Sequence, residues 1–155
     1  MKILFICSSN MCRSPYCEYV FKRMIDGNED IVVNSAATLH QASEIHDKAR
    51  QALLREGFDI DYINAHQPRW IYKNMHLVKE ADVIIGMVKS HRILIPLPYK
   101  KKFITLSEAV TGKYTPIKDP WLEKDMNVYF EAMDEIKEYL EAYKDKLLSK
   151  KSKNS

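Results

Sequence analysis

Short apolar runs alternate along the chain with longer amphipathic segments. Four of the runs have the length and the continuous apolar character of buried strands: residues 2–7, 31–35, 83–87 and 103–106. Five segments with helical spacing or helix-ending residues are predicted to be helices: residues 14–24, 47–56, 70–80, 90–95 and 127–148. The last segment carries the clearest apolar stripe, formed by Tyr129, Ala132, Met133, Ile136, Leu140, Tyr143 and Leu147.

The alternation of strands and helices predicts an α/β protein. Short apolar strands separated by helices form parallel sheets that are covered on both faces, so we expect a three-layer α/β/α fold with a four-stranded, twisted parallel sheet. No repeat or linker divides the chain, and residues 1–149 are interpreted as one domain with a basic, frayed tail over 150–155. In such folds function gathers at the carboxyl ends of the strands, where Cys7, Ser35 and Met87 are expected.

The junction between the first strand and the first helix carries the strongest chemical signal. Cys7 ends the strand, Arg13 follows after five residues, and Pro15 lies in the first helical turn, where proline is tolerated. A loop at a helix N-terminus aims backbone N–H groups at one point, which binds anions and favours a thiolate. The loop therefore suits a cysteine that attacks phosphorus while Arg13 binds two phosphate oxygens. Further phosphate contacts are expected from Ser8, Ser9, Asn10, Met11, Cys12 and Ser14.

Composition and charge narrow the remaining classes. The chain has 155 residues, is 46% hydrophobic and 29% charged, and has a net charge of +3, which is ordinary for a globular domain. Basic residues gather at 100–102 and 150–153 without a nucleic-acid-binding motif, so we expect no nucleic-acid partner. No apolar run approaches the roughly 20 residues of a membrane span. We expect a cytoplasmic monomer that makes no membrane contact.

The three cysteines, Cys7, Cys12 and Cys17, lie close together in the sequence. An odd number of cysteines in a chain without a signal peptide argues against a disulfide framework. No histidine occurs before His40, so the cysteines lack neighbours for a zinc site. We therefore expect no metal and no cofactor, and we expect Cys17 to lie in the core.

The loop resembles that of the low-molecular-weight protein tyrosine phosphatase family, which has the pattern C-x-G-N-x-C-R-S-P. The chain matches this pattern at Cys7, Asn10, Cys12, Arg13, Ser14 and Pro15. Three later segments resemble the family's S-A-[GA]-T, S-H-x-A-R and D-P-Y motifs in the family's order: residues 34–38, 65–69 and 119–121. The four segments together make the resemblance far more specific than the loop alone. The resemblance implies the family's fold and its tyrosine phosphatase activity.

Hydrolysis of a phosphate ester requires a proton for the leaving oxygen, and Asp119 is the candidate donor. It lies in the chain's only Asp-Pro pair, on a predicted loop over 107–121 that can fold over the site. The resemblance to the D-P-Y motif implies the same role. We expect Cys7 to attack phosphorus while Asp119 protonates the leaving phenolate, and Asp119 then to activate the water that hydrolyses the phosphocysteine.

The resemblance also implies supporting roles. In relatives the residues that match Asn10, Ser35 and His66 hydrogen-bond to one another and keep the loop in shape. Taken alone, Ser35 is an ordinary strand-end residue and His66 a surface or satisfied core histidine. Cys12 is either a redox partner that forms a reversible disulfide with Cys7 or a residue that packs under the loop.

Four positions depart from the family pattern. Ser9 replaces the usual loop glycine, and Val88 replaces an aspartate that helps to orient the loop arginine. Trp121 and Leu122 replace a pair of tyrosines. Ser9 places a side chain where a conformationally permissive residue is often favoured. Val88 predicts that Arg13 is held differently or less firmly.

The mouth of the pocket is expected at Met11, Gln41, Trp121 and Leu122, with Trp121 as an apolar wall for an aromatic ring. We therefore expect phosphotyrosine-containing proteins as substrates, and inorganic phosphate or vanadate-like anions as ligands of the loop. Protein arginine phosphatases resemble this chain but typically have threonine at the position of Met11. The bulkier methionine favours phosphotyrosine.

Three other functions share a similar loop. Phosphocysteine carrier proteins lack the arginine and the acid loop, which argues against that function here. Thioredoxin-coupled arsenate reductases need later cysteines, and none follows Cys17. A phosphotyrosine-binding protein without turnover stays open because of Ser9 and Val88. Hydrolysis of a small aryl phosphate distinguishes an enzyme from a carrier or a binding protein.

Overall fold

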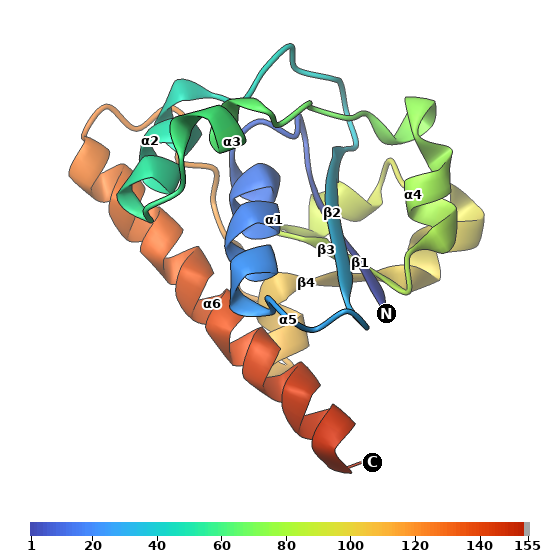
Figure 1. Cartoon of the computed structure of the whole chain (residues 1–155). Helices are drawn as coiled ribbons and strands as arrows, with labels where there is room; N and C mark the ends of the chain where they lie inside the picture. The colour runs from blue at the N-terminus through green and yellow to red at the C-terminus, as the bar shows by residue number, and fades with distance from the viewer. Residues whose placement is uncertain (154–155) are drawn as a thin grey trace.

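The structure, a computed structural model, describes residues 1–153 and shows one parallel sheet between two helical layers (Figure 1). Its four strands lie in the order β2-β1-β3-β4, and every neighbouring pair is parallel. The strands are β1 (Lys2–Cys7), β2 (Val32–Ala37), β3 (Val83–Gly86) and β4 (Phe103–Thr105). The predicted α/β class with a four-stranded parallel sheet is confirmed.

Alternate residues of the central strand β1 face the two helical layers. Ile3 and Phe5 belong to the core on one side of the sheet, and Leu4 and Ile6 belong to the core on the other. The first side is covered by α1 (Arg13–Met24), α2 (Asp47–Arg55), α3 (Ile60–Asn64), α5 (Leu106–Thr111) and α6 (Met126–Lys153). The second side is covered by η1 (Ile71–Lys73), α4 (Met75–Glu80), η2 (Lys89–Arg92) and η3 (Leu97–Lys102).

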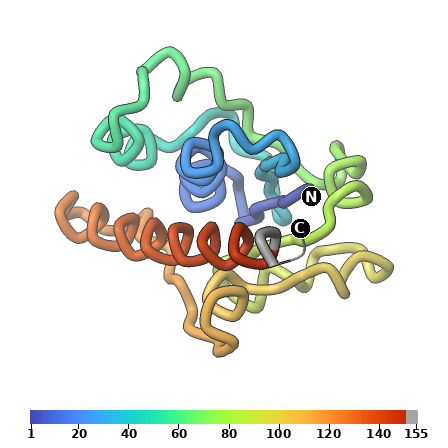
Figure 2. Tube along the Cα trace, turned by 60° about the horizontal axis from the view of Figure 1, so that its bottom comes forward, coloured from blue at the N-terminus to red at the C-terminus, as the bar shows by residue number. Residues whose placement is uncertain are grey.

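Helix α1 is the most enclosed helix beside the site. All residues from Arg13 to Phe21 are buried, because the sheet, α2 and α6 surround it. Helix α6 crosses α1 and continues past the sheet (Figures 1 and 2), and the predicted apolar stripe supplies its buried face. Helix α6 ends at Lys153, within the basic segment 150–155 that we expect to fray, and residues 154–155 lie outside the described part.

The strand ends differ from the prediction by a few residues. Strand β2 continues to Ala37, which pairs with Cys7 and donates its N–H to Arg69 O at 2.6 Å. Ser35 therefore lies two residues before the end of its strand, and Met87 follows the end of β3. Both residues still lie at the carboxyl edge of the sheet.

The helix predicted over 70–80 is broken at Asn74. This residue has φ −140° and ψ 46°, and its side chain donates to Trp70 O at 2.9 Å. An asparagine that hydrogen-bonds nearby backbone competes with the helical ladder, so η1 and α4 form in place of one helix.

Helix α5 occupies the first part of the segment that was predicted to be a loop over 107–121. Thr105 and Glu108 form a capping box at its start, and Gly112 ends it with φ 78°. Both signals are present in the sequence. The short helix α3 was also missed, although Asp59 caps it by accepting from two backbone N–H groups. The helix predicted over 90–95 is instead the 3-10 segment η2.

Candidate active site

The loop that is predicted to bind phosphate, here called the phosphate loop, joins β1 to α1 at the carboxyl edge of the sheet. Cys7 is the last residue of β1 and is only 4% exposed, and its Sγ lies 2.9 Å from Ser14 Oγ. Asn10 has φ 59°, and among the described residues it is the one non-glycine residue with positive φ. Asparagine tolerates this region better than most residues. Ser9 does not adopt it, so the lost family glycine does not strain the loop.

The Asn10 side chain contacts two hydroxyl groups, one of which reaches the sulfur of Cys7. Its Nδ2 donates to Ser14 Oγ at 2.9 Å and to Ser35 Oγ at 2.8 Å. Ser35 in turn donates to Glu18 Oε1 at 2.7 Å. Because Ser14 Oγ accepts from Asn10, its own proton is available to the sulfur of Cys7.

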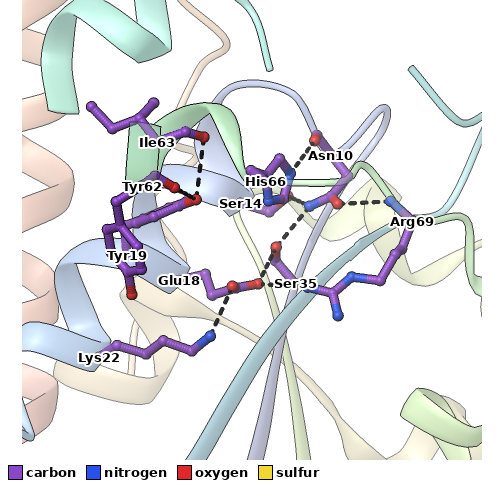
Figure 3. Close-up of polar contacts among 10 residues, drawn as sticks. All are labelled: Asn10, Ser14, Glu18, Tyr19, Lys22, Ser35, Tyr62, Ile63, His66 and Arg69. Carbon is purple, nitrogen blue, oxygen red and sulfur yellow. Dashed lines mark hydrogen bonds and ion pairs between the residues drawn. The ribbon is translucent and has the colours of Figure 1, made fainter. Parts of the chain in front are cut away.

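His66 and Arg69 hold Asn10 by its main chain and by its side chain, respectively (Figure 3). His66 Nε2 donates to Asn10 O at 3.0 Å, and the Arg69 N–H donates to Asn10 Oδ1 at 3.0 Å. Burial lowers the pKa of His66, which favours the neutral ring that makes this contact. The structure thus places Asn10, Ser35 and His66 in one network, and their role in supporting the loop stays a prediction.

Sequence reasoning missed Glu18, the buried carboxylate of this network. Its Oε1 accepts from Ser35 and from Arg69 at 3.2 Å, and its Oε2 accepts from Lys22 at 2.9 Å (Figure 3). Glu18 is 6% exposed, and a carboxylate this deep requires such partners. The signal in the sequence was an acidic residue within the apolar run of α1.

Tyr19 fixes the segment that carries His66. Its hydroxyl donates to Tyr62 O at 2.6 Å (Figure 3), and burial raises the pKa of Tyr19 to about 12. The phenol therefore stays protonated and remains a donor at neutral pH.

Arg13 is held in a different way from the one that the family pattern implies. Its side chain is 5% exposed, NH1 donates to Ile117 O at 2.8 Å, and NH2 lies 3.4 Å from Asp119 Oδ2. The Ile117 N–H is anchored in turn on Met87 O at 3.2 Å. A backbone carbonyl thus orients Arg13 where Val88 offers no carboxylate.

His91 supports Met87, the residue that binds the Ile117 N–H. Its Nδ1 accepts from the Met87 N–H at 3.2 Å. Burial, assisted by the charge of Arg13, lowers the pKa of His91 to about 4, so the ring is neutral and free to accept. No local motif in the sequence points to this contact of His91.

A family model described as low molecular weight phosphotyrosine protein phosphatase matches residues 2–154. The chain belongs to this family. It is 27% identical over 145 residues to the protein-arginine-phosphatase of Bacillus subtilis, covering 90% of this chain and 92% of the relative. It is 26% identical over 146 residues to PtpB, a low molecular weight protein-tyrosine-phosphatase of Staphylococcus epidermidis, covering 88% and 97%.

Solved structures agree with the sequence comparison. A structure of the YwlE arginine phosphatase, described as a mutant with a phosphorylated active-site serine, aligns with a TM-score of 0.83 at 27% identity. The alignment covers 95% of each chain. The fold of this phosphatase family therefore extends over almost the whole chain.

The residues predicted at the mouth of the pocket differ in how far they are exposed. Trp121 is 43% exposed and Leu122 is 71% exposed, while Met11 is partly buried and packs against the core. The exposed Gln41 lies in a segment tied to the phosphate loop, since Leu39 N and Ala42 N donate to Ser8 O and Ser9 O. Ser9 Oγ also shares a 3.2 Å hydrogen bond with His40 Nε2, a contact the sequence did not suggest.

The three cysteines of the phosphatase are free and buried. Burial, assisted by the charge of Asp119, raises the pKa of Cys12 to about 12, and burial also raises the pKa of Cys17. Cys12 therefore stays a thiol at neutral pH. Cys17 lies in the core as expected, and a reversible Cys7–Cys12 disulfide stays a prediction.

The described part of the chain is residues 1–153. No group of three or more metal-ligating side chains comes together in that part of the chain. No helix there is long and apolar enough to cross a membrane.

Proposed function

We propose that this phosphatase hydrolyses phosphotyrosine in proteins through a phosphocysteine intermediate. The observation that carries the proposal is the convergence of three groups: the Cys7 sulfur with a hydroxyl donor at 2.9 Å, the buried Arg13 fork, and Asp119 at 3.4 Å from that fork. A nucleophile, a phosphate-binding cation and a proton donor thus meet at one point.

The first step transfers the phosphoryl group to sulfur. The Cys7 thiolate attacks phosphorus as the bond to the phenolic oxygen breaks, and Asp119 in its acid form gives its proton to that oxygen. Arg13 and the loop N–H groups bind the other three oxygens throughout. Arg13 Nε is buried and has no partner within residues 1–153, so a phosphate oxygen would satisfy it.

The second step hydrolyses the phosphocysteine and regenerates free Cys7. The Asp119 carboxylate takes a proton from water as that water attacks phosphorus, and the sulfur–phosphorus bond breaks to release inorganic phosphate. The hydroxyl of Ser14 stabilises the departing thiolate of Cys7. The phosphorylated active-site serine of the YwlE mutant supports a covalent intermediate at this position. No step calls for a metal or a cofactor.

Phosphotyrosine is favoured by the exposed ring of Trp121 beside Asp119, whose Oδ1 accepts from the Trp121 N–H at 3.1 Å. A flat apolar face of this kind binds an aromatic ring. Phosphoarginine is the second candidate, because one relative of nearly equal identity is an arginine phosphatase. We infer phosphotyrosine from Trp121 together with Met11.

The test compares phosphate release from a phosphotyrosine peptide and a phosphoarginine peptide without added metal. We expect release from phosphotyrosine that Cys7→Ser abolishes and inorganic phosphate or vanadate inhibits. Release mainly from phosphoarginine would keep the mechanism but overturn the substrate. No release from either peptide by the folded, reduced protein would overturn the enzyme in favour of a binding or carrier function.

A further inference from the structure

The segment that carries the general acid, residues 118–124, has few attachments. Within residues 1–153, only two side chains from elsewhere form hydrogen bonds or ion pairs with it: Arg13 and Lys48. Its other hydrogen bonds are local, such as Glu123 N–H to Pro120 O at 2.9 Å. The placement of Asp119 therefore depends on these two cations.

Lys48 holds the segment by its main chain. It is the second residue of α2, and its ammonium donates to Trp121 O at 2.6 Å and to Glu123 O. Both carbonyls lie within four residues of Asp119. The ammonium thereby fixes the backbone of the segment without a hydrogen bond to the Asp119 side chain.

The start of α2 is also attached to the phosphate loop. The N–H of His46, the residue that caps α2, donates to Met11 O at 3.0 Å. Lys48 lies two residues later on the same rigid element. The first turn of α2 therefore sets the distance between the phosphate loop and the acid segment.

Substrate binding makes the second attachment more important. A phosphate group takes the Arg13 fork and competes with Asp119, whose contact with Arg13 is already long at 3.4 Å. Lys48 is then the remaining side-chain tether of the segment. We propose that Lys48 is a positioning residue, which keeps Asp119 over the leaving oxygen during phosphoryl transfer.

This inference rests on the proposed function and makes a selective claim. A displaced acid slows only the step that needs its proton, because proton transfer requires a carboxyl oxygen within hydrogen-bond reach of the leaving oxygen. The effect on kcat/KM, which reports formation of the phosphocysteine, must therefore grow with the basicity of the leaving group.

The experiment measures kcat/KM for two esters. Phenyl phosphate has a basic phenolate leaving group, and 2,4-dinitrophenyl phosphate has a leaving group that departs without a proton. For Lys48→Met we expect about a tenfold loss with phenyl phosphate, a fraction of what a general acid supplies, and little loss with the dinitrophenyl ester. Lys48→Arg keeps donors for the two carbonyls and should restore most of the rate. Lys124→Met removes a charge from the same segment at a side chain that makes no hydrogen bond or ion pair in the described part of the chain, and should behave as the natural protein.

Inhibition by inorganic phosphate provides a second readout. It should be unchanged in Lys48→Met, because the phosphate loop is intact. Equal losses with both esters, or no loss with either, would overturn the positioning role. Asp119→Asn gives the upper limit of leaving-group sensitivity, and a natural protein that hydrolyses neither ester would refute the proposed function instead.

Trp121 supplies a measurement that does not depend on turnover. In a Trp70→Phe background, its fluorescence reports the acid segment alone. We expect Lys48→Met to increase quenching by acrylamide in the presence of phosphate, and unchanged quenching would contradict the tether.

Discussion

The two loops that meet at the active site are built in opposite ways. In the phosphate loop, Asn10 alone forms four hydrogen bonds, to Ser14, Ser35, Arg69 and His66. The acid segment 118–124 has two cationic attachments and exposes most of its side chains.

The difference is explained by the task that we propose for each loop. The phosphate loop binds charge that is present throughout the reaction, so its donors are useful only if they are fixed before substrate arrives. The acid segment must admit a substrate and then place one oxygen correctly, which requires a loop that yields but returns. Rigidity is therefore concentrated on one side of the site.

Asn10→Ala should show the largest effect of this rigidity. It removes three side-chain hydrogen bonds and puts alanine at a φ of 59°, which alanine disfavours. We expect kcat/KM to fall about 10²- to 10³-fold, comparable to the loss of an oxyanion donor, with weaker inhibition by phosphate. Gln67→Ala, at an exposed neighbour of His66, is the control. Unchanged phosphate affinity would show that the loop keeps its shape without Asn10.

Acidification should destabilise contacts on both sides of the site, because each depends on a buried neutral histidine. His66 donates to Asn10 O, and His91 accepts from the Met87 N–H. The unfolded chain protonates His91 near its ordinary pKa of 6.5, whereas the folded protein resists until about 4. This contribution to stability is complete above pH 6.5 and is lost as the pH falls toward 4. Between about pH 7.5 and about pH 5 it should cost about 2 kcal/mol.

The measurement is the free energy of unfolding as a function of pH. His91→Asn keeps an acceptor for the Met87 N–H but has no proton to bind, so its curve should be flatter over this range. A variant with the same slope as the natural protein would assign the acid sensitivity to other groups.

The smallest expected effect concerns the open face of the acid segment. Trp121→Ala removes the exposed ring and should raise KM for a phosphotyrosine peptide a fewfold, about 1 kcal/mol. Inhibition by inorganic phosphate should not change, because phosphate has no ring to contact. A matching loss of phosphate affinity would place Trp121 in the rigid half of the site.

The fold was readable from the sequence where one local signal decides the structure. The apolar runs of β1 and β3 and the stripe of α6 are such signals, and the strand ends moved by only one or two residues. The sequence contains the signals for the start and end of α5 at Thr105, Glu108 and Gly112. The prediction is nevertheless wrong for this segment, because it places a loop with the Asp-Pro pair there. The break at Asn74 depends on a side-chain contact that periodicity does not contain.

Residues of the candidate site could be predicted from the sequence where they match a motif of the family. Arg13 and Asp119 lie on distant parts of the sequence and still approach to 3.4 Å, while the catalytic roles of Cys7, Arg13 and Asp119 stay predictions. Glu18 and Lys48 were not found, because their partners lie on other elements and only the folded chain brings them together. Contacts of this kind are a property of packing.

Both ends of the acid segment are fastened to the same rigid body. Ile117 is bonded to Met87 at the end of β3, and Met126 begins α6, which packs along α1. The segment is therefore a loop whose two ends are fixed. Loops of equal length from other members of the family could be grafted between those ends, and substrate preference could change while the phosphate loop is left unchanged.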